Sequence, residues 1–251
     1  MAIMFHMLGS GSTGNCGLLR SSQSNILIDA GFSGKHIKEL LSQHGLSIAD
    51  IHAIFITHEH LDHIQGLRGL RKEHHLQFFA NQATANAIEN KFHFDISWNH
   101  FKNETTFSFR DFSVTSFSLP HDAADPVGYV FRSAQEEAPN SLAWMTDLGY
   151  VPSHVAPLVR DVDYLVIESN YDNDLLTQDT KRPPYIKARI RSRYGHLPNE
   201  AAIHFLKHNV SDSWKKIVFA HVSADCNRED IIQKLVQEAG NFRFEFAVAK
   251  P

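Results

Sequence analysis

A short histidine-rich segment, residues 57–63, constrains the fold of this chain more than any other feature. The residues before it, 52–57, are apolar enough for a buried β-strand. Apolar residues three positions apart follow it, as they do on one face of a helix. The segment therefore stands where a strand ends and a helix begins. It reads Thr-His-Glu-His-Leu-Asp-His and contributes His58, His60, Asp62 and His63.

These residue types in this order predict a metal site. His58 and His60 stand two positions apart in the chain and can bind one ion. Asp62 and His63 follow half a turn further along and can bind a second ion. The pattern differs from the His-Glu-x-x-His helix of zinc proteases, because Asp62 stands four residues after His58. A histidine-rich loop without metal is the alternative, since the chain holds 17 histidines. The density of the set favours a metal site.

Five further polar residues each follow an apolar stretch that is typical of a strand. Any one of them alone would more often be a turn residue or a helix cap than a ligand. Five such residues after a dense histidine cluster favour one shared site. They are Asp29, His121, Asp147, Glu168 and His221.

The string His58-x-His60-x-Asp62-His63 resembles the signature of the metallo-β-lactamase superfamily, and the five other residues stand in the order that this family uses. The resemblance covers essentially the whole chain. It implies an α+β fold, a four-layer αββα sandwich, with residues 1–251 forming one domain. It also implies two divalent ions, with Mn²⁺ favoured and Zn²⁺ or Fe compatible with the same ligands. The implied ligands are His58, His60 and His121 for one ion, Asp62, His63 and His221 for the other, and Asp147 as the bridge.

Several other strings resemble the YycJ/WalJ-like nuclease branch of this superfamily. That branch is associated with manganese-dependent exonuclease activity on DNA from the 5′ end. The resemblance therefore implies a phosphodiesterase in which a hydroxide held between two ions attacks phosphorus. Pro198 departs from the branch, whose members tend to carry serine there. The matching strings lie at residues 9–15, 120–126, 146–151, 168–172, 195–200 and 221–227.

We expect distinct roles for individual side chains. His196 would hold the scissile phosphate or protonate the leaving oxygen, and Asp62 and Asp147 would act as catalytic metal ligands. Asp29 and Glu168 would accept hydrogen bonds from metal-binding groups without touching an ion. The expected substrate contacts are Ser10, Ser12, Thr13, Asn15, Lys187 and Arg189.

The loop at residues 9–14 has the Gly-x-Gly-x-x-Gly spacing of a dinucleotide site. The residues after it read as strand and turn, so no helix N-terminus would face a pyrophosphate, and we reject a dinucleotide fold. Its N–H groups and hydroxyls can instead hold a terminal phosphate. A tight strand connection without a ligand is an equally good interpretation.

Residues 181–193 carry six basic residues and no acid, although the net charge of the chain is −4. Such a run is commonly a solvated helix face. Because it leads into Gly195 and His196, it is also well placed to hold a phosphate backbone. DNA is the expected partner, and RNA stays open. A small cyclic phosphodiesterase and a non-catalytic nucleic-acid-binding protein are the alternative functions.

Composition excludes several other classes. Two cysteines, Cys16 and Cys226, form no disulfide scaffold and no multi-cysteine zinc site, and they fit a reducing cytoplasm. No apolar stretch approaches the ~20 residues of a membrane-spanning helix, so we expect no membrane contact.

Asn227 and Asp230 read as N-cap residues of the last helix. Strands are predicted near 3–8, 17–20, 25–29, 53–57, 77–80, 105–119, 127–133, 141–146, 163–168, 216–220 and 243–249, and helices at 34–43, after the metal loop, and at 82–91, 172–178, 184–193, 199–208 and 228–239.

Overall fold

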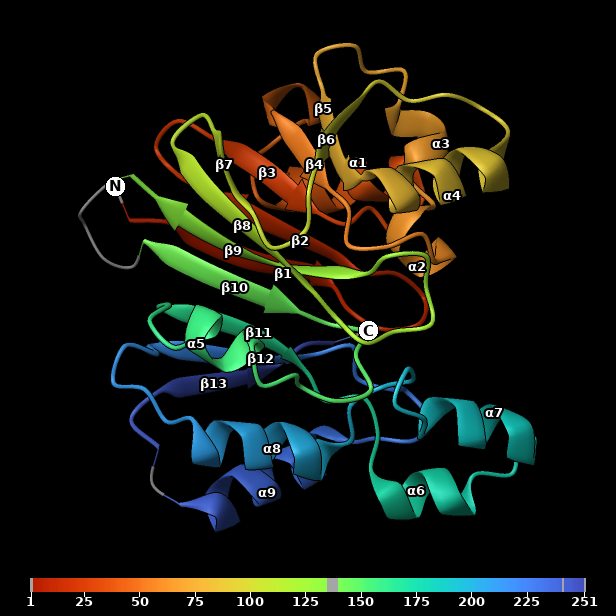
Figure 1. The fold of residues 1–251 in the computed structure, drawn as a ribbon, viewed down its shortest axis with the longest axis vertical. Coiled ribbons are helices and arrows are strands. Elements are labelled where there is room, and N and C mark those ends of the chain that lie inside the picture. The colour runs from red at the N-terminus through yellow and green to blue at the C-terminus, as the bar shows by residue number, and fades with distance from the viewer. Residues whose placement is uncertain (1, 135–139, 241, 251) are drawn as a thin grey trace.

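The computed structural model describes residues 2–134, 140–240 and 242–250, which form two β-sheets packed face to face (Figure 1). The first sheet holds, in spatial order, β1 (Met4–Gly9), β2 (Cys16–Arg20), β3 (Asn25–Ile28), β4 (Ala53–Phe55), β5 (Gln77–Asn81) and β6 (Trp98–Phe101). The second holds β13 (Glu245–Val248), β12 (Lys216–Ala220), β11 (Tyr164–Glu168), β10 (Ser141–Met145), β9 (Val127–Ser133), β8 (Phe112–Ser118) and β7 (Thr106–Phe109).

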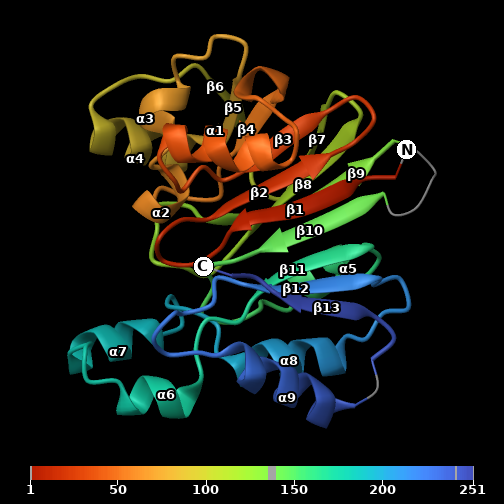
Figure 2. The ribbon, with the colours of Figure 1, turned by 180° about the vertical axis from the view of Figure 1, so that it is seen from behind.

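Helices cover the outer face of each sheet, as both views show (Figures 1 and 2). The first sheet is covered by α1 (Gly34–Gln43), α3 (Leu67–Leu70) and α4 (Gln82–Phe92). The second is covered by α5 (Val155–Val159), α8 (Asn199–His208) and α9 (Glu229–Ala239). The remaining helices, α2 (Leu61–Ile64), α6 (Asn173–Gln178) and α7 (Pro184–Ile190), lie at one end of the sandwich. Within the described residues, no helix combines the length and the apolar character needed to cross a bilayer.

Side-chain alternation along the strands builds three apolar layers. In β10, Leu142 and Trp144 pack between the two sheets, whereas Ala143 and Met145 pack under the helices of the second sheet. Successive side chains of a strand point to opposite faces, so an apolar run of this kind requires cover on both sides. The four-layer αββα sandwich is therefore confirmed.

The structure differs from the predicted elements in several places. The predicted strand 105–119 is a hairpin of β7 and β8, because Arg110 takes a positive φ of 51° and turns the chain. The helix expected after the metal loop is two short helices, α2 and α3, and β6 and α5 were not predicted. The N-cap prediction for Asn227 is wrong. Arg228 occupies the N-cap position of α9 without a side-chain hydrogen bond, and the Asn227 side chain is buried, where its Nδ2 donates to Ser169 O at 2.8 Å.

Strand direction brings the predicted site residues to one edge. β3 is parallel to β4, and β10, β11 and β12 are mutually parallel. The carboxyl ends of parallel strands meet at the same edge of a sheet, where ligands of α/β proteins commonly bind. Both sheets therefore deliver the residues that follow these strands to one region, close to α2 (Figure 1).

Candidate metal and catalytic site

Three of the site residues stand in a backbone conformation that is uncommon outside glycine. Asp29, Asp147 and His221 follow β3, β10 and β12 with φ values of 62°, 62° and 53°. Left-handed conformations are sparsely populated by residues with a Cβ, least rarely by Asp, Asn and His, and they cluster at functional sites. The fold therefore holds these side chains at the sheet edge by local geometry that a regular strand end would not provide.

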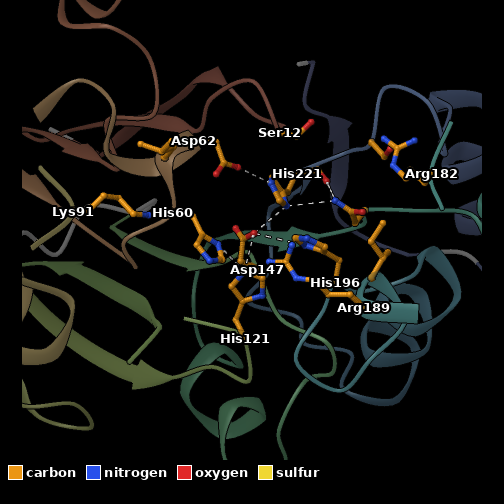
Figure 3. Close-up of a pocket in the computed structure, with 14 residues that line it drawn as sticks. Ser12, His60, Asp62, Lys91, His121, Asp147, Arg182, Arg189, His196 and His221 are labelled. Carbon is orange, nitrogen blue, oxygen red and sulfur yellow. Dashed lines mark hydrogen bonds and ion pairs between the residues drawn. The ribbon is translucent and has the colours of Figure 1, made fainter. Parts of the chain in front are cut away.

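The predicted metal ligands converge on Asp147. Figure 3 shows its carboxylate with His60 and His121 on one side and His196 and His221 on the other. The set His58, His60 and His121 and the set Asp62, His63 and His221 each bring their ligand atoms within 4.8 Å of one another. Asp147 joins His58 and His63 in a third such set. A fourth set joins Asp147 to Glu168, His196 and His221. The clustering is compatible with divalent metal binding, and the number of ions and their individual ligands stay predictions.

Most of the histidines are held through Nδ1 by an acceptor from the protein. This contact fixes the ring and leaves Nε2 for another partner, as in metal-binding histidines. His60 is the exception, because its Nδ1 lies 3.2 Å from His121 Nε2. The held rings are His58 by Thr57 Oγ1 (3.0 Å), His63 by Asp29 Oδ2 (2.8 Å), His121 by Gly195 O (2.9 Å) and His221 by Glu168 Oε1 (2.8 Å).

Buried atoms without hydrogen-bond partners identify the centre of the site. Of eight such atoms among the described residues, three belong to predicted ligands: His58 Nε2, His221 Nε2 and Asp147 Oδ2. An unsatisfied buried polar atom costs about 1–3 kcal/mol, and a missing ion is one of its standard explanations. Imidazole nitrogens and carboxylate oxygens are ligands for Mn²⁺, Zn²⁺ and Fe alike. The residues present therefore fit the metal ions that the family resemblance implies.

Charges within the site complement one another. Burial opposes the charge on His221, but Asp147, Asp62 and Glu168 outweigh it and raise its pKa to about 10. Burial likewise opposes the ionisation of Asp147, yet His221 and His63 hold its pKa well below the usual value. Burial, followed by repulsion from His63, lowers the pKa of His58 well below its usual range. Because ligands bind metal in their deprotonated form, ions compete with protons for these side chains.

We predict that the two buried carboxylates behind the histidines tune metal affinity. Asp29 accepts from His63 Nδ1 and from Thr57 N, each at 2.8 Å, and Glu168 accepts from His196 Nδ1 and His221 Nδ1, also at 2.8 Å. Asp29→Asn and Glu168→Gln should each weaken metal binding roughly 10- to 100-fold. Titration with Mn²⁺ followed by calorimetry measures this.

Asp163→Asn is the matched control for these carboxylates. Asp163 is also buried and accepts from Ser141 Oγ at 2.6 Å, but it precedes β11, whereas Glu168 ends that strand. Its substitution should leave metal affinity unchanged. If all three variants bind metal as tightly as the unsubstituted protein does, Asp29 and Glu168 are turn residues with no role in metal binding.

A cavity of about 380 Å³ lies over the candidate ligands. His60, Asp62 and Lys91 stand on one side of it, and Arg182 and Arg189 stand on the other (Figure 3). Three cationic side chains therefore flank a floor of imidazole and carboxylate groups. Such an arrangement suits an anionic ligand that reaches Asp147.

Only some of the predicted substrate-contact residues line the cavity. Ser12 and Arg189 line the cavity. Ser10 is buried and its hydroxyl accepts from His221 N at 2.7 Å, while the Nδ2 atom of buried Asn15 lies 3.0 Å from His63 Nε2. In this structure these two side chains contact candidate ligand residues and do not line the cavity, and a contact with substrate stays a prediction for them.

Two further predicted contacts lie away from the cavity lining. Lys187 Nζ donates to Thr177 O at 2.9 Å, because α7 turns this residue toward α6. Thr13 is exposed, and neither residue is among the described residues that line the cavity. Sequence reasoning missed several lining residues. Arg182 lies in the basic run, and Asn170 and Ser223 lie in the strings 168–172 and 221–227 that resemble the nuclease branch, but none of them was assigned to the site. The missed residues are Leu61, Lys91, Asn170, Arg182, Ile190 and Ser223.

Comparisons with known proteins agree with this geometry. The family described as beta-lactamase superfamily domain matches residues 24–213. The exodeoxyribonuclease YycJ of Bacillus anthracis is 35% identical over 247 residues, which cover 95% of this chain and 89% of that protein. The exodeoxyribonuclease WalJ of Streptococcus pneumoniae is 35% identical over 231 residues, which cover 90% of this chain and 84% of that protein.

Solved structures show the same fold. The metallo-β-lactamase fold protein YhfI from Bacillus subtilis superposes with a TM-score of 0.77 at 17% identity, covering 100% of this chain and 97% of that one. At this identity the likeness concerns the fold alone. The sequence matches and the site geometry go further: the chain belongs to the metallo-β-lactamase superfamily, in the branch of the YycJ and WalJ exodeoxyribonucleases.

Proposed function

We propose that this protein is a metal-dependent phosphodiesterase that removes nucleotides from the 5′ end of DNA. One observation carries the proposal: Asp147 and His221, each with a buried ligand atom that lacks a hydrogen-bond partner, line a cavity that cations flank. The identity of 35% to two exodeoxyribonucleases over most of the chain supports DNA as the substrate. The two free cysteines are compatible with a reducing cytoplasm, which we include in the proposal.

Two divalent ions, Mn²⁺ in our proposal, would be held by the two histidine-rich sets and bridged by Asp147. Bound there, the ions would supply a nucleophile from water at neutral pH and neutralise charge that builds up on the phosphate. The protein supplies orientation, since Asp29, Glu168 and the Gly195 carbonyl fix the rings that face the ions.

His196 is the side chain that we assign to the substrate. Its Nδ1 is held by Glu168 Oε1 at 2.8 Å, and its ring lines the cavity. The ring is therefore oriented from behind and offers Nε2 to the phosphate. From this position it would hold a non-bridging oxygen or donate a proton to the leaving oxygen.

Cationic side chains on both sides of the cavity would hold the flanking phosphates. Arg182 is positioned by Asp179 at 3.2 Å and Asp225 at 3.1 Å, and Arg189 by an ion pair with Asp122. Ser12, at the tip of the glycine-rich loop, would receive the terminal 5′-phosphate and so set the direction of degradation. These residues would contact phosphates and no base edges, so degradation would not depend on the base sequence, as expected for an exonuclease.

The proposal predicts release of nucleotides from the 5′ end. DNA labelled at either end, carrying a 5′-phosphate or a 5′-hydroxyl, is incubated with the protein in Mn²⁺. We expect mononucleotides from the 5′ end, faster with the 5′-phosphate. His196→Ala should lower kcat roughly 100-fold or more, the size of a lost general acid, with its metal content unchanged.

His204→Ala is the control for His196→Ala, because His204 is a helix residue on α8 that stacks on His208 away from the cavity. It should degrade DNA at the unsubstituted rate. Rapid cleavage of a small cyclic phosphodiester without degradation of DNA or RNA would instead favour the small-molecule alternative. Binding of DNA with no cleavage of any phosphodiester would favour the non-catalytic alternative.

A further inference from the structure

A second cavity lies where the two sheets stop overlapping. β1 is the last strand of the first sheet, and in both views β11, β12 and β13 lie beyond it (Figures 1 and 2). Along this margin no described strand of the first sheet covers the inner face of the second. The cavity there has a volume of about 500 Å³, and we call it the β1 groove. Residues 5–9 form one wall, and Tyr164, Lys216, Val218 and residues 247–250 form the other.

The floor of the β1 groove is the uncovered inner face of the second sheet. Val218 of β12 packs between the sheets, and Ala247 of β13 is its partner in the strand pairing. Successive side chains of a strand alternate between faces, so Lys216 points to the same face as Val218. Lys216 is half-buried, and its ammonium group makes no ion pair with any described residue. The floor therefore combines apolar surface with an unpaired cation.

Positive charge gathers around this floor. His6 of β1 lies against His44, with 4.4 Å between the ring centroids. Burial is the largest cause that lowers the pKa of His6, and repulsion from His44 is the next, followed by Arg20 and Lys216. Lys250 also lines the groove, whereas no carboxylate side chain of the described residues does. A ligand with negative charge would complement these groups.

The wall formed by β1 is an unpaired strand edge. Among the described strands β1 pairs only with β2, so its alternate N–H and C=O groups point away from β2 toward the groove. Proteins usually protect such an edge with lysine, proline or inward-pointing charges. β1 reads Met-Phe-His-Met-Leu-Gly and has none of these residues. A register shift between Met7 and Gly9 leaves the preceding part of the strand regular and free to pair.

We propose that the β1 groove binds an extended, acidic peptide segment of a partner protein, which adds a strand to β1. The added strand would lie about 4.8 Å from β1 and extend the first sheet over the uncovered floor. Alternate side chains would rest on Val218 and Ala247, and acidic side chains would reach Lys216 and the His6–His44 pair.

A second copy of this chain is a poorer occupant of the groove. Pairing two β1 edges would bring two sets of the same cations together, and like charges in an interface oppose association. The proposal does not depend on the proposed function. Among the described residues, none lines both the β1 groove and the cavity over Asp147, so a bound peptide would leave that cavity open.

The first test probes the main-chain pairing in the metal-loaded, unsubstituted protein. The probe is a fluorescent peptide of about eight residues, with valine at every second position and glutamate between. Two further versions carry N-methyl groups on the amides of one edge or of the other. Methylation of the edge that faces β1 should lower affinity roughly 10-fold or more, because several hydrogen bonds are lost. Methylation of the other edge should change affinity little, and hydrogen exchange should slow in β1 when the unmethylated peptide binds.

The second test reverses the charge of the floor. Lys216→Glu should bind the glutamate peptide about 10-fold more weakly and should bind a peptide with lysine in place of glutamate more tightly than the unsubstituted protein does. The gain with the lysine peptide shows that the variant is folded. Lys72→Glu is the control, because Lys72 is exposed and lies outside the groove lining, and its affinities should not change. Arg189→Ala should also keep its affinity, since Arg189 lines the other cavity.

Four outcomes would overturn the proposal. The glutamate peptide does not bind, or methylation of either edge weakens it equally. Equal losses in Arg189→Ala and Lys216→Glu would place the peptide in the cavity over Asp147 instead. Finally, sedimentation could show a dimer in which β1 amides are protected without peptide, and the occupant of the groove would then be a second copy of the chain.

Discussion

Asp147→Ala is expected to reduce bound metal from about two ions to fewer than one per chain and to lower DNA degradation roughly 100-fold or more. Asp147 is 2% exposed, and its two oxygens lie 3.2 Å from His63 Nε2 and 3.8 Å from His121 Nε2. It therefore touches both predicted ligand sets. Removing it leaves each ion without a shared anion in a buried site. Elemental analysis of protein purified without chelators measures the metal content.

Two further variants make this result specific. Asp147→Asn keeps the shape of the side chain but removes its charge, and it should lose metal nearly as completely as the alanine variant. Asp95→Ala removes an exposed carboxylate elsewhere and should retain both ions and full activity. Fewer than one ion per chain in the unsubstituted protein, with no further loss in Asp147→Ala, would exclude the two-ion site.

The second large effect is expected from Gly31→Ala. A Cβ at Gly31 would lie 1.7 Å from Asp62 O and 2.4 Å from Asn15 N, both backbone atoms that cannot rotate away. Three segments meet here, because Gly31 N donates to Asn15 O at 2.9 Å and Asn15 N donates to Asp62 O at 2.7 Å. Relieving the overlap must displace the metal loop.

We expect this substitution to destabilise the fold by about 3 kcal/mol or more, the upper range for overpacking, and to lower Tm by roughly 6–12 °C. Metal affinity should fall with it. Gly69→Ala is the control, because Gly69 lies within α3 and the nearest neighbour of its added Cβ outside the α3 backbone, Gly34 Cα in α1, is 4.0 Å away. It should be neutral or slightly stabilising, since alanine favours helix over glycine. A Tm for Gly31→Ala equal to that of Gly69→Ala would contradict the close packing.

Periodicity predicted most elements because their apolar residues repeat regularly. The stretch 199–208 alternates apolar and polar residues at helical spacing and forms α8 with these bounds. β6 was not predicted because it is a short, half-exposed edge strand in which both Asn99 and His100 are exposed, so its sequence lacks the usual alternation of apolar and polar residues. The break between β7 and β8 depends on the positive φ of Arg110, for which arginine carries no sequence signal.

The candidate ligands were predictable for a different reason than the cavity walls. Metal ligands come from a few residue types, here His and Asp, and the candidates follow strands whose direction fixes where they meet. Lys91, in contrast, reaches the cavity from α4 only because the sheets stack as they do. Ser10 and Asn15 looked like surface hydroxyl and amide groups, yet packing of their loop against the metal loop buried both. The burial of these side chains depends on tertiary contacts, which cannot be predicted from the local sequence.

The division of the candidate site between two sheets has a consequence for the protein during its synthesis. His58, His60, Asp62 and His63 follow strands of the first sheet, whereas Asp147, Glu168 and His221 belong to the second. A nascent chain shorter than 221 residues has part of the site without the rest, even if its first sheet has already formed. We therefore expect hydrolytic capacity to arise only when the second sheet docks. On this expectation, the nascent chain on the ribosome hydrolyses no phosphodiester until the fold is nearly complete.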